Sequence, residues 1–189
     1  MLSDQPTQLL KGHLLIAEPS IIGDLSFNRA AILLAEHNGE GSIGFILNKP
    51  LRYDLNDLVP EIKPVIPVFN GGPVEQDNLY FIHKISDLIP ESIMISEGLY
   101  WSGNFEYVLK LIKKGEINKN DIRFFLGYSG WDSNQLNNEL NNNTWILTEN
   151  SHNKNIITAV DEVFWKNKML DLGGEYSLWS NAPEHPSHN

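Results

Sequence analysis

The chain has 189 residues, with 14 Lys and Arg against 24 Asp and Glu, so its formal net charge is −10. Hydrophobic residues make up 41% of the sequence, a globular composition, and we expect one domain over residues 1–189 with a core at about 9–183 and polar ends. Cysteine is absent, which excludes disulfides, thiol catalysis and cysteinyl metal sites, and with no secretory signal or bilayer-length apolar run we expect a cytoplasmic protein.

The first half of the chain predicts short strands with little helix. The strands are expected at residues 13–17, 30–36, 42–47, 65–69, 79–83 and 93–96. The turn Asn38-Gly39-Glu40-Gly41 joins the second and third of them as a hairpin. Pro67 lies inside the fourth and predicts an edge strand, because proline donates no hydrogen bond to a neighbouring strand. A short helical turn is expected at residues 54–58.

The second half predicts helices between strands. The apolar stripe of Phe105, Val108 and Ile112 indicates an amphipathic helix over residues 103–114. Residues 122–128 are apolar almost throughout, which predicts a central strand buried on both faces. The remaining expected elements are a helix at 132–140, a strand at 145–147 and a last helix at 157–172. Because no regular strand–helix–strand alternation runs through the chain, an α+β fold is favoured over a doubly wound sheet.

A strand, a turn and a helix are predicted around two glycines. Gly127 and Gly130 bracket a sharp turn, since glycine reaches positive φ without a steric clash. Asp132 stands where an N-cap is expected, and Gln135, three residues later, can reach back to the backbone of the cap. Trp131 precedes the cap as one half of a hydrophobic staple. All of these residues therefore have a structural explanation.

The same segment also offers polar groups for binding or catalysis. Gln135 and Glu139 share one helix face, and a glycine-rich turn ahead of a helix can bind an anion. The turn lacks the Lys-Ser/Thr pair of a phosphate loop and the glycine spacing of a dinucleotide site. Ser129 lies in Gly-x-Ser-Gly, whereas a nucleophile elbow requires Gly-x-Ser-x-Gly, which weakens a hydrolase interpretation. Structural roles are favoured over a binding surface, and both over catalysis.

Several blocks along the chain form a recognisable set: Phe125-Leu126-Gly127-Tyr128-Ser129-Gly130-Trp131 with Gln135-Leu136 and Glu139-Leu140; Gly12–Ala17 with Pro19, Asp24 and Phe27; His37, Gly41 and Gly44 with Asn48-Lys49-Pro50; Asn70–Val74; and Ala182-Pro183. The resemblance of this set is to the AlgH/YqgE family of bacterial proteins. It implies an α+β fold with a mixed, bifurcated sheet folded into a pseudo-barrel with flanking helices. Some family members are labelled transcriptional regulators, and the resemblance supplies no catalytic residues.

Two arginines beside apolar strands and one glycine turn are the other features with two interpretations. Arg29 and Arg123 border apolar strands, and a buried arginine requires a carboxylate partner, for which Glu36 and Glu139 are the candidates. The alternative is a clamp for the carboxylate of a ligand. The turn Asn70-Gly71-Gly72-Pro73 is either a plain turn or a nest of backbone N–H groups for an anion.

Charge and histidine spacing argue against two classes of function. DNA binding depends on cations that displace counterions, so an acidic chain without a helix-turn-helix pair is a poor direct DNA binder. The six histidines include no His-x-x-x-His pair, so we expect no metal site, and no cofactor is implied.

These observations favour a non-enzymatic binding or regulatory module that acts through a protein or metabolite partner. We assign no catalytic residue. The candidate binding surface consists of His37, Asn48, Asn70, Gly71, Gly72, Tyr128, Trp131, Gln135 and Glu139. One alternative is a small-molecule sensor or enzyme with a cleft at the Gly71-Gly72 and Gly127–Trp131 turns. The other is a transcriptional regulator that contacts DNA directly, which the charge disfavours.

Overall fold

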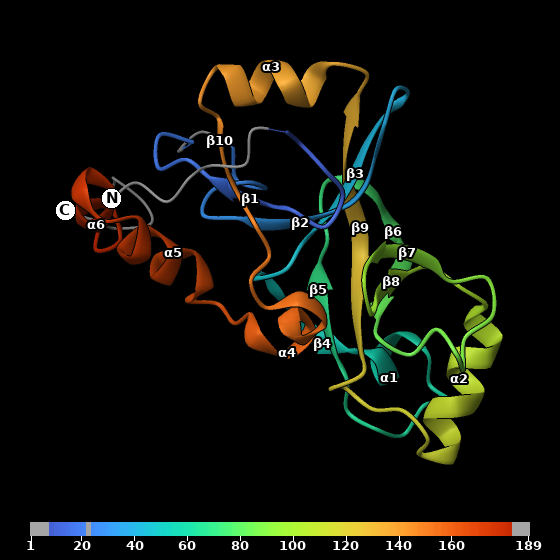
Figure 1. Cartoon of the computed structure of the whole chain (residues 1–189). Helices are drawn as coiled ribbons and strands as arrows, with labels where there is room; N and C mark the ends of the chain where they lie inside the picture. The colour runs from blue at the N-terminus through green and yellow to red at the C-terminus, as the bar shows by residue number, and fades with distance from the viewer. Residues whose placement is uncertain (1–7, 22–23, 183–189) are drawn as a thin grey trace.

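A ten-stranded sheet runs through the middle of the molecule and carries its helices at the periphery (Figure 1). This computed structural model describes residues 8–21 and 24–182; most of the polar ends expected from the sequence lies outside these residues. The strands are β1 (Leu14–Ala17), β2 (Ala31–Asn38), β3 (Gly41–Ile46), β4 (Pro50–Asp54), β5 (Pro67–Asn70), β6 (Val74–His83), β7 (Ile93–Ser96), β8 (Leu99–Trp101), β9 (Ile122–Asp132) and β10 (Trp145–Thr148). The helices are α1 (Leu55–Leu58), α2 (Phe105–Lys114), α3 (Gln135–Asn141), α4 (Ile156–Ala159), α5 (Phe164–Leu172) and α6 (Gly174–Trp179), with a 3₁₀ turn at Asn153–Asn155.

The sheet forks at β9, its central strand. The main path runs β10-β1-β2-β3-β9-β6-β8-β7, and β5, with β4 beside it, pairs with β9 as well. Phe124 of β9 pairs in parallel with Val68 of β5, while Ser129 further along pairs antiparallel with Gly44 of β3. The expected α+β fold with a bifurcated sheet is therefore confirmed. The described strands β10 and β7 end the path without pairing to each other, so the sheet is not closed into a barrel.

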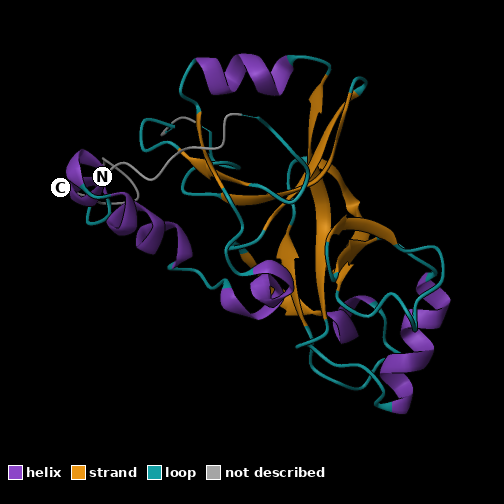
Figure 2. Cartoon of the chain, viewed as in Figure 1, coloured by secondary structure: helices purple, strands orange, loops and turns teal. Residues whose placement is uncertain are grey.

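Neighbouring residues of β9 feed two separate cores. Side chains alternate between the faces of a strand, and Phe125 joins a core shared with α3, α4 and α5, whereas Phe124 joins a core shared with α1 and α2. Both rings are fully buried, as predicted from the apolar run. Figure 2 shows the two groups of helices on opposite sides of the strands.

The predicted reversal at Gly127–Gly130 is wrong, because β9 continues in extended form to Asp132. Gly127 has φ 71° and lies opposite residues 75–78 of β6, where the pairing register of the two strands shifts, and a Cβ atom on it would lie 2.5 Å from Gly72 O. The glycine therefore permits a close backbone contact within a continuous strand. Because β9 runs this far, α3 begins at Gln135 and not at Asp132.

The edge position predicted for Pro67 is also wrong. Pro67 is the first residue of β5, which lies between β4 and β9. Proline is tolerated at the first position of a strand. The strands β4 and β8 were not predicted, since both are short and follow no clear alternation of apolar and polar residues.

The predicted last helix is divided into α4 and α5. Val160, between them, has an extended backbone with φ −97° and ψ 124°, and its carbonyl accepts a hydrogen bond from Arg123 Nη2 at 2.9 Å. A helix continued through Val160 would use this carbonyl within its own turn. Gly173, expected as a stop, turns the chain into α6. No helix among residues 8–21 and 24–182 combines the length and apolar character needed to cross a membrane.

Candidate functional site

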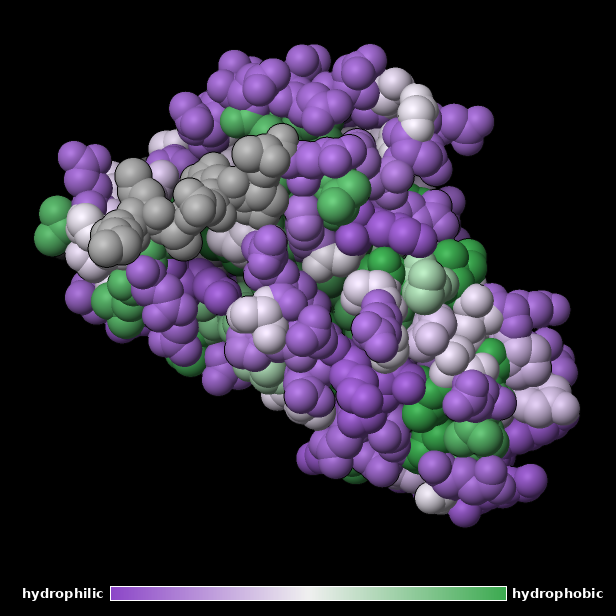
Figure 3. All heavy atoms as spheres, in the orientation of Figure 1, coloured by the Kyte–Doolittle hydropathy of each residue, from purple (hydrophilic) through white to green (hydrophobic). Residues whose placement is uncertain are grey.

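Trp131, Gln135 and Glu139 form one network that fastens α3 to the sheet. Glu139 Oε2 accepts hydrogen bonds from Trp131 Nε1 at 2.8 Å and from Trp145 Nε1 at 2.7 Å, and Gln135 Nε2 donates to Glu139 Oε1 at 2.9 Å. The side-chain Oε1 of Gln135 accepts from the backbone N–H of Asp132 at 3.0 Å, which is the backward reach expected from the sequence. The outer face of α3 is hydrophilic (Figure 3). The polar atoms of this network are largely satisfied by one another.

Asn70, Gly71 and Gly72 form a close backbone crossing with β9. A Cβ atom on Gly71 would lie 2.2 Å from the carbonyl oxygen of Gly127, so only glycine fits there. Gly71 N–H donates to Leu126 O at 2.9 Å, and Gly72 N–H donates to Asn70 Oδ1 at 3.1 Å. These amides already have protein acceptors, so the turn is not an anion nest.

His37 and Tyr128 line two shallow grooves beside the β2–β3 hairpin. His37 Nδ1 lies 2.8 Å from Oγ of Ser42, its cross-strand partner, in a groove of about 350 Å³. Tyr128 lines a neighbouring groove of about 370 Å³ together with Glu36 and Glu40. Asp132 borders both grooves. The surroundings of the hairpin are therefore acidic.

Asn48 lines neither groove and fixes the backbone of Arg29. Its side chain is only 6% exposed; Oδ1 accepts from Ala31 N–H at 2.8 Å and Nδ2 donates to Arg29 O at 2.9 Å. Arg29 has φ 55°, a left-handed conformation that is uncommon outside glycine. Strained residues of this kind persist only where the surroundings hold them, and they concentrate at functional sites.

Arg29 and Asn48 open onto a basic cleft with a volume of about 640 Å³, defined here by Arg29, Lys49, Arg52 and Lys166. Glu162 and the apolar residues Leu25, Leu51 and Val163 complete much of its lining. The cations come from the β1–β2 connection, the segment around β4, and α5. Two of the three arginines of this acidic chain are thus gathered around one open volume.

Two cleft cations are oriented by backbone carbonyls. Lys49 Nζ donates to Ser26 O at 2.7 Å, and Arg29 Nη2 donates to Ala182 O. The Arg29 guanidinium also lies over the Trp165 ring, 5.2 Å from its centroid. Trp165 is itself held by a bond from Nε1 to Ala17 O at 2.8 Å. The wall that presents these cations is therefore anchored to the sheet.

Arg123 is buried, but a carboxylate partner is not what holds it. Its guanidinium donates to Leu47 O at 2.7 Å and to Val160 O at 2.9 Å, and lies 4.2 Å from the Phe69 centroid. Burial lowers the pKa of Arg123 to about 10, against the opposing effect of Asp161. The expected pairing with Glu36 or Glu139 is thus wrong, because backbone carbonyls satisfy this arginine.

His83 is the other buried titratable group. Its ring is fully buried, with Nε2 3.1 Å from Ser102 O and from Ser92 Oγ, and Nδ1 accepting from Ile85 N–H at 3.3 Å. Desolvation lowers the pKa of His83 to about 4. Ser92 donates its own proton to Ile89 O at 2.7 Å, so this serine and histidine do not form a nucleophile and base pair.

The family described as AlgH-like matches residues 14–177 of the chain. The chain belongs to the AlgH-like family. An AlgH-like relative from Bacteroides thetaiotaomicron, named a UPF0301 protein, is 41% identical over 181 residues, which cover 95% of this chain and 91% of the relative. A UPF0301 protein from Cytophaga hutchinsonii is 38% identical and covers 96% of this chain and 100% of its own.

Two solved structures share the AlgH-like fold. The solution structure of AlgH from Pseudomonas aeruginosa has a TM-score of 0.71 and 30% identity, and covers 98% of this chain and 100% of its own. The crystal structure of DIP2367 from Corynebacterium diphtheriae also has a TM-score of 0.71, at 20% identity, and covers 94% of this chain and 95% of its own. The resemblance expected from the sequence motifs is confirmed.

The basic cleft was largely missed by reasoning from the sequence. Of its residues only Asn48 stood in the predicted surface, and Arg29 was considered for a ligand clamp. Lys49 and Arg52 are far from Lys166 in sequence, and nothing in their spacing shows that β4 and α5 line one cleft. The Asn48-Lys49-Pro50 block was the one available signal.

Proposed function

We propose that this AlgH-like protein is a non-enzymatic binding module, acting in regulation through a metabolite or protein partner, and that it recognises an anionic group of that partner in the basic cleft. The observation that carries the proposal is the gathering of Arg29, Lys49, Arg52 and Lys166 around one volume of about 640 Å³ in a chain of net charge −10. Arginine and lysine are the side chains that bind phosphate and carboxylate.

Preorganisation supports this assignment. The Asn48 amide holds Arg29 in its left-handed conformation, and the Trp165 ring lies against the Arg29 guanidinium. A cation held in place before binding loses less conformational entropy when the ligand arrives. The cleft is therefore better suited to binding than four cations on flexible loops would be.

The proposal of binding over catalysis rests on how the polar candidates are used. Ser129 is fully buried and donates to Gly71 O at 3.1 Å, and Glu139 accepts from two indoles. His83 is buried and bonded to backbone groups. A cytoplasmic location, expected from the cysteine-free composition, belongs to the same proposal.

Isothermal titration of the full chain with pyrophosphate and, separately, with citrate tests the proposal and distinguishes phosphate from carboxylate chemistry. We expect one of the two anions to bind, and Arg52→Ala to weaken its binding about 5- to 10-fold through the loss of one charge-assisted contact. Lys119→Ala removes an exposed cation elsewhere on the chain and serves as the matched control. Absence of binding to both anions, or equal effects of the two variants, would refute the proposal.

The competing function is an enzyme or sensor at the β2–β3 hairpin, and the contact between His37 Nδ1 and Ser42 Oγ at 2.8 Å is the observation that favours it. A histidine beside a serine hydroxyl can act as its general base. Turnover of an activated ester that disappears in Ser42→Ala, with the melting temperature unchanged, would support the enzyme. DNA binding with a steep dependence on salt would instead support the direct regulator.

A further inference from the structure

The two ends of the main strand path, β10 and β7, differ in how their outer edges are covered. At the β7 end, Lys11 Nζ donates to Met94 O at 2.8 Å and so covers a backbone acceptor of the edge strand. A lysine at a strand edge is a common protection against pairing with another chain. Among residues 8–21 and 24–182, no side chain bonds to the backbone of β10 at the opposite end.

The outer edge of β10 presents backbone groups in a defined order. Glu18 N–H donates to Thr144 O at 3.1 Å, just before β10 pairs antiparallel with β1 from Trp145↔Ala17 to Thr148↔Leu14. In an antiparallel pair every second residue bonds to the neighbour, and the residues between them direct N–H and C=O away. The register therefore turns the backbone groups of Trp145 and Leu147 outward.

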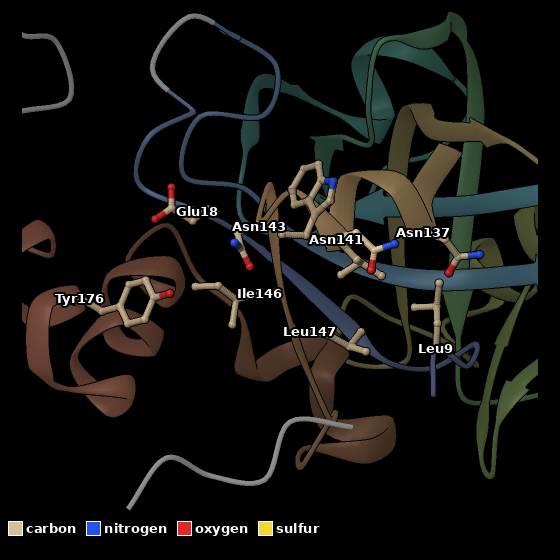
Figure 4. Close-up of a pocket in the computed structure, with 10 residues that line it drawn as sticks. Leu9, Glu18, Asn137, Asn141, Asn143, Ile146, Leu147 and Tyr176 are labelled. Atoms are coloured by element: carbon tan, nitrogen blue, oxygen red, sulfur yellow. The ribbon is translucent and has the colours of Figure 1, made fainter. Parts of the chain in front are cut away.

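A recess of about 270 Å³ follows this edge. Figure 4 shows Ile146 and Leu147 in its middle, with Tyr176 and Glu18 toward one end and Asn137 and Leu9 toward the other. Asn137, Asn141 and Asn143 also line it, and their side-chain amides can both donate to and accept from a backbone. No lysine or arginine lies among the described lining residues.

We propose that the β10 edge binds an extended, basic segment of a partner protein, which adds to the sheet as a further strand through Trp145 and Leu147. Extended peptides bind open sheet edges in this way, with main-chain hydrogen bonds providing affinity. Charge complementarity selects the partner, since Glu18 lies at the start of β10 and the exposed Glu149 follows its end. This site is separate from the basic cleft and does not depend on its function.

The position of β10 also argues against a second copy of the chain as the occupant. The strand lies in a recess with α3 on one side and Tyr176 of α6 among the lining. In a symmetric dimer the β10 strands of both copies would lie in recesses. The residues around the two recesses would collide before the strands could pair. A single extended segment enters where a second sheet does not.

The test uses acetyl-Lys-Val-Lys-Val-Lys-amide and its counterpart with Glu in place of Lys, titrated by NMR into the isotopically labelled full chain. We expect the basic peptide to bind, to slow hydrogen exchange at the Leu147 amide, and to bind at least about 5-fold more tightly than the acidic peptide. Leu147→Pro removes the outward N–H, a loss that a strand edge tolerates, together with a buried side chain of the core. We expect the folded variant, checked by its NMR spectrum, not to bind the peptide.

A charge-matched pair of variants separates this site from a general attraction of the acidic chain for basic peptides. Asn141→Lys adds a cation inside the recess, whereas Asn138→Lys adds one on the exposed surface of α3, outside its lining. Weakening by the first and not by the second supports the proposal. Equal weakening by both, equal binding of the two peptides, or unchanged exchange at Leu147 would overturn it.

Discussion

Polar side chains bond to one another in the network around Glu139, whereas they border an open volume in the basic cleft. Under α3, the carboxylate of Glu139 accepts from two indoles and from Gln135, so the polar groups of that region bond to one another. In the cleft, Arg52 and Lys166 border an open volume of about 640 Å³. Removing a side chain from the first region should lower the free energy of unfolding, whereas removing one from the second should weaken the binding of an anion. The predictions below test this difference.

The largest effect is expected at Trp131, which is 6% exposed and packs edge-on to Trp145 with ring centroids 6.1 Å apart. Trp131→Ala should lower the free energy of unfolding by about 3–5 kcal/mol, because it opens a cavity and removes a donor to Glu139. Urea unfolding measures the loss. At temperatures where the variant is folded, its affinity for the cleft anion should be unchanged; a selective loss of that affinity would erase the distinction between the regions.

His83 makes the comparison testable by pH, because it is a buried polar side chain whose hydrogen bonds are all within the protein. Its pKa is lowered to about 4 in the folded chain, from 6.5. The unfolded state therefore binds the proton first as pH falls. The stabilisation is complete above about pH 6.5 and is lost between about 6.5 and 4, by about 2–3 kcal/mol. Urea unfolding across this range measures it, with His83→Asn as the control that should flatten this component of the profile.

Asn48 combines features of the two regions. Its side chain is buried and hydrogen-bonded, and it holds Arg29, a residue of the basic cleft. Asn48→Ala should destabilise the fold by about 2 kcal/mol, because the Ala31 N–H and the Arg29 carbonyl lose their partner. It should also weaken the binding of the anion in the basic cleft, because Arg29 is no longer held in place. Calorimetry and titration of one preparation measure both effects. A change in stability without a change in affinity would mean that Arg29 is not part of the site.

The smallest effect on stability is expected at Lys166. Lys166→Ala removes a cation that forms no ion pair with the described residues, so the free energy of unfolding should change by less than about 0.5 kcal/mol. Affinity for the anion should nevertheless fall several-fold. Thermal melting and anion titration measure the two quantities. A large drop in melting temperature would show that this cation supports the fold, contrary to the comparison.

The sequence predicted local structure where one physical pattern dominated. The stripe of Phe105, Val108 and Ile112, followed by Gly115 in the left-handed conformation, is α2 as expected. The apolar run of β9 correctly indicated a central strand. Gly127 was misjudged because a glycine that permits a turn and one that permits a close backbone contact look the same in sequence. In the structure, a Cβ atom on Gly127 would lie 2.5 Å from Gly72 O.

The candidate site was less predictable than the fold, for a related reason. Glu139 stood out because its motif is dense in recognisable residues, yet those residues hold α3 in place. Arg52 and Lys166 were unremarkable in sequence, and only the packing of α5 near β4 brings them to one cleft. Contacts between distant segments are set by the tertiary arrangement, which single-sequence patterns do not contain.

The fork at β9 has a consequence for the order in which the molecule is built on the ribosome. Gly44 of β3 pairs with Ser129, and Val68 of β5 pairs with Phe124, so neither branch of the sheet can pair with β9 until that strand has been synthesised. Pairings of such long sequence separation close late and slowly. Until residue 132 has left the exit tunnel, β3, β5 and β6 each lack β9 as a pairing partner. The nascent chain therefore passes through a stage with three unpaired strand edges, which chaperones can protect from aggregation.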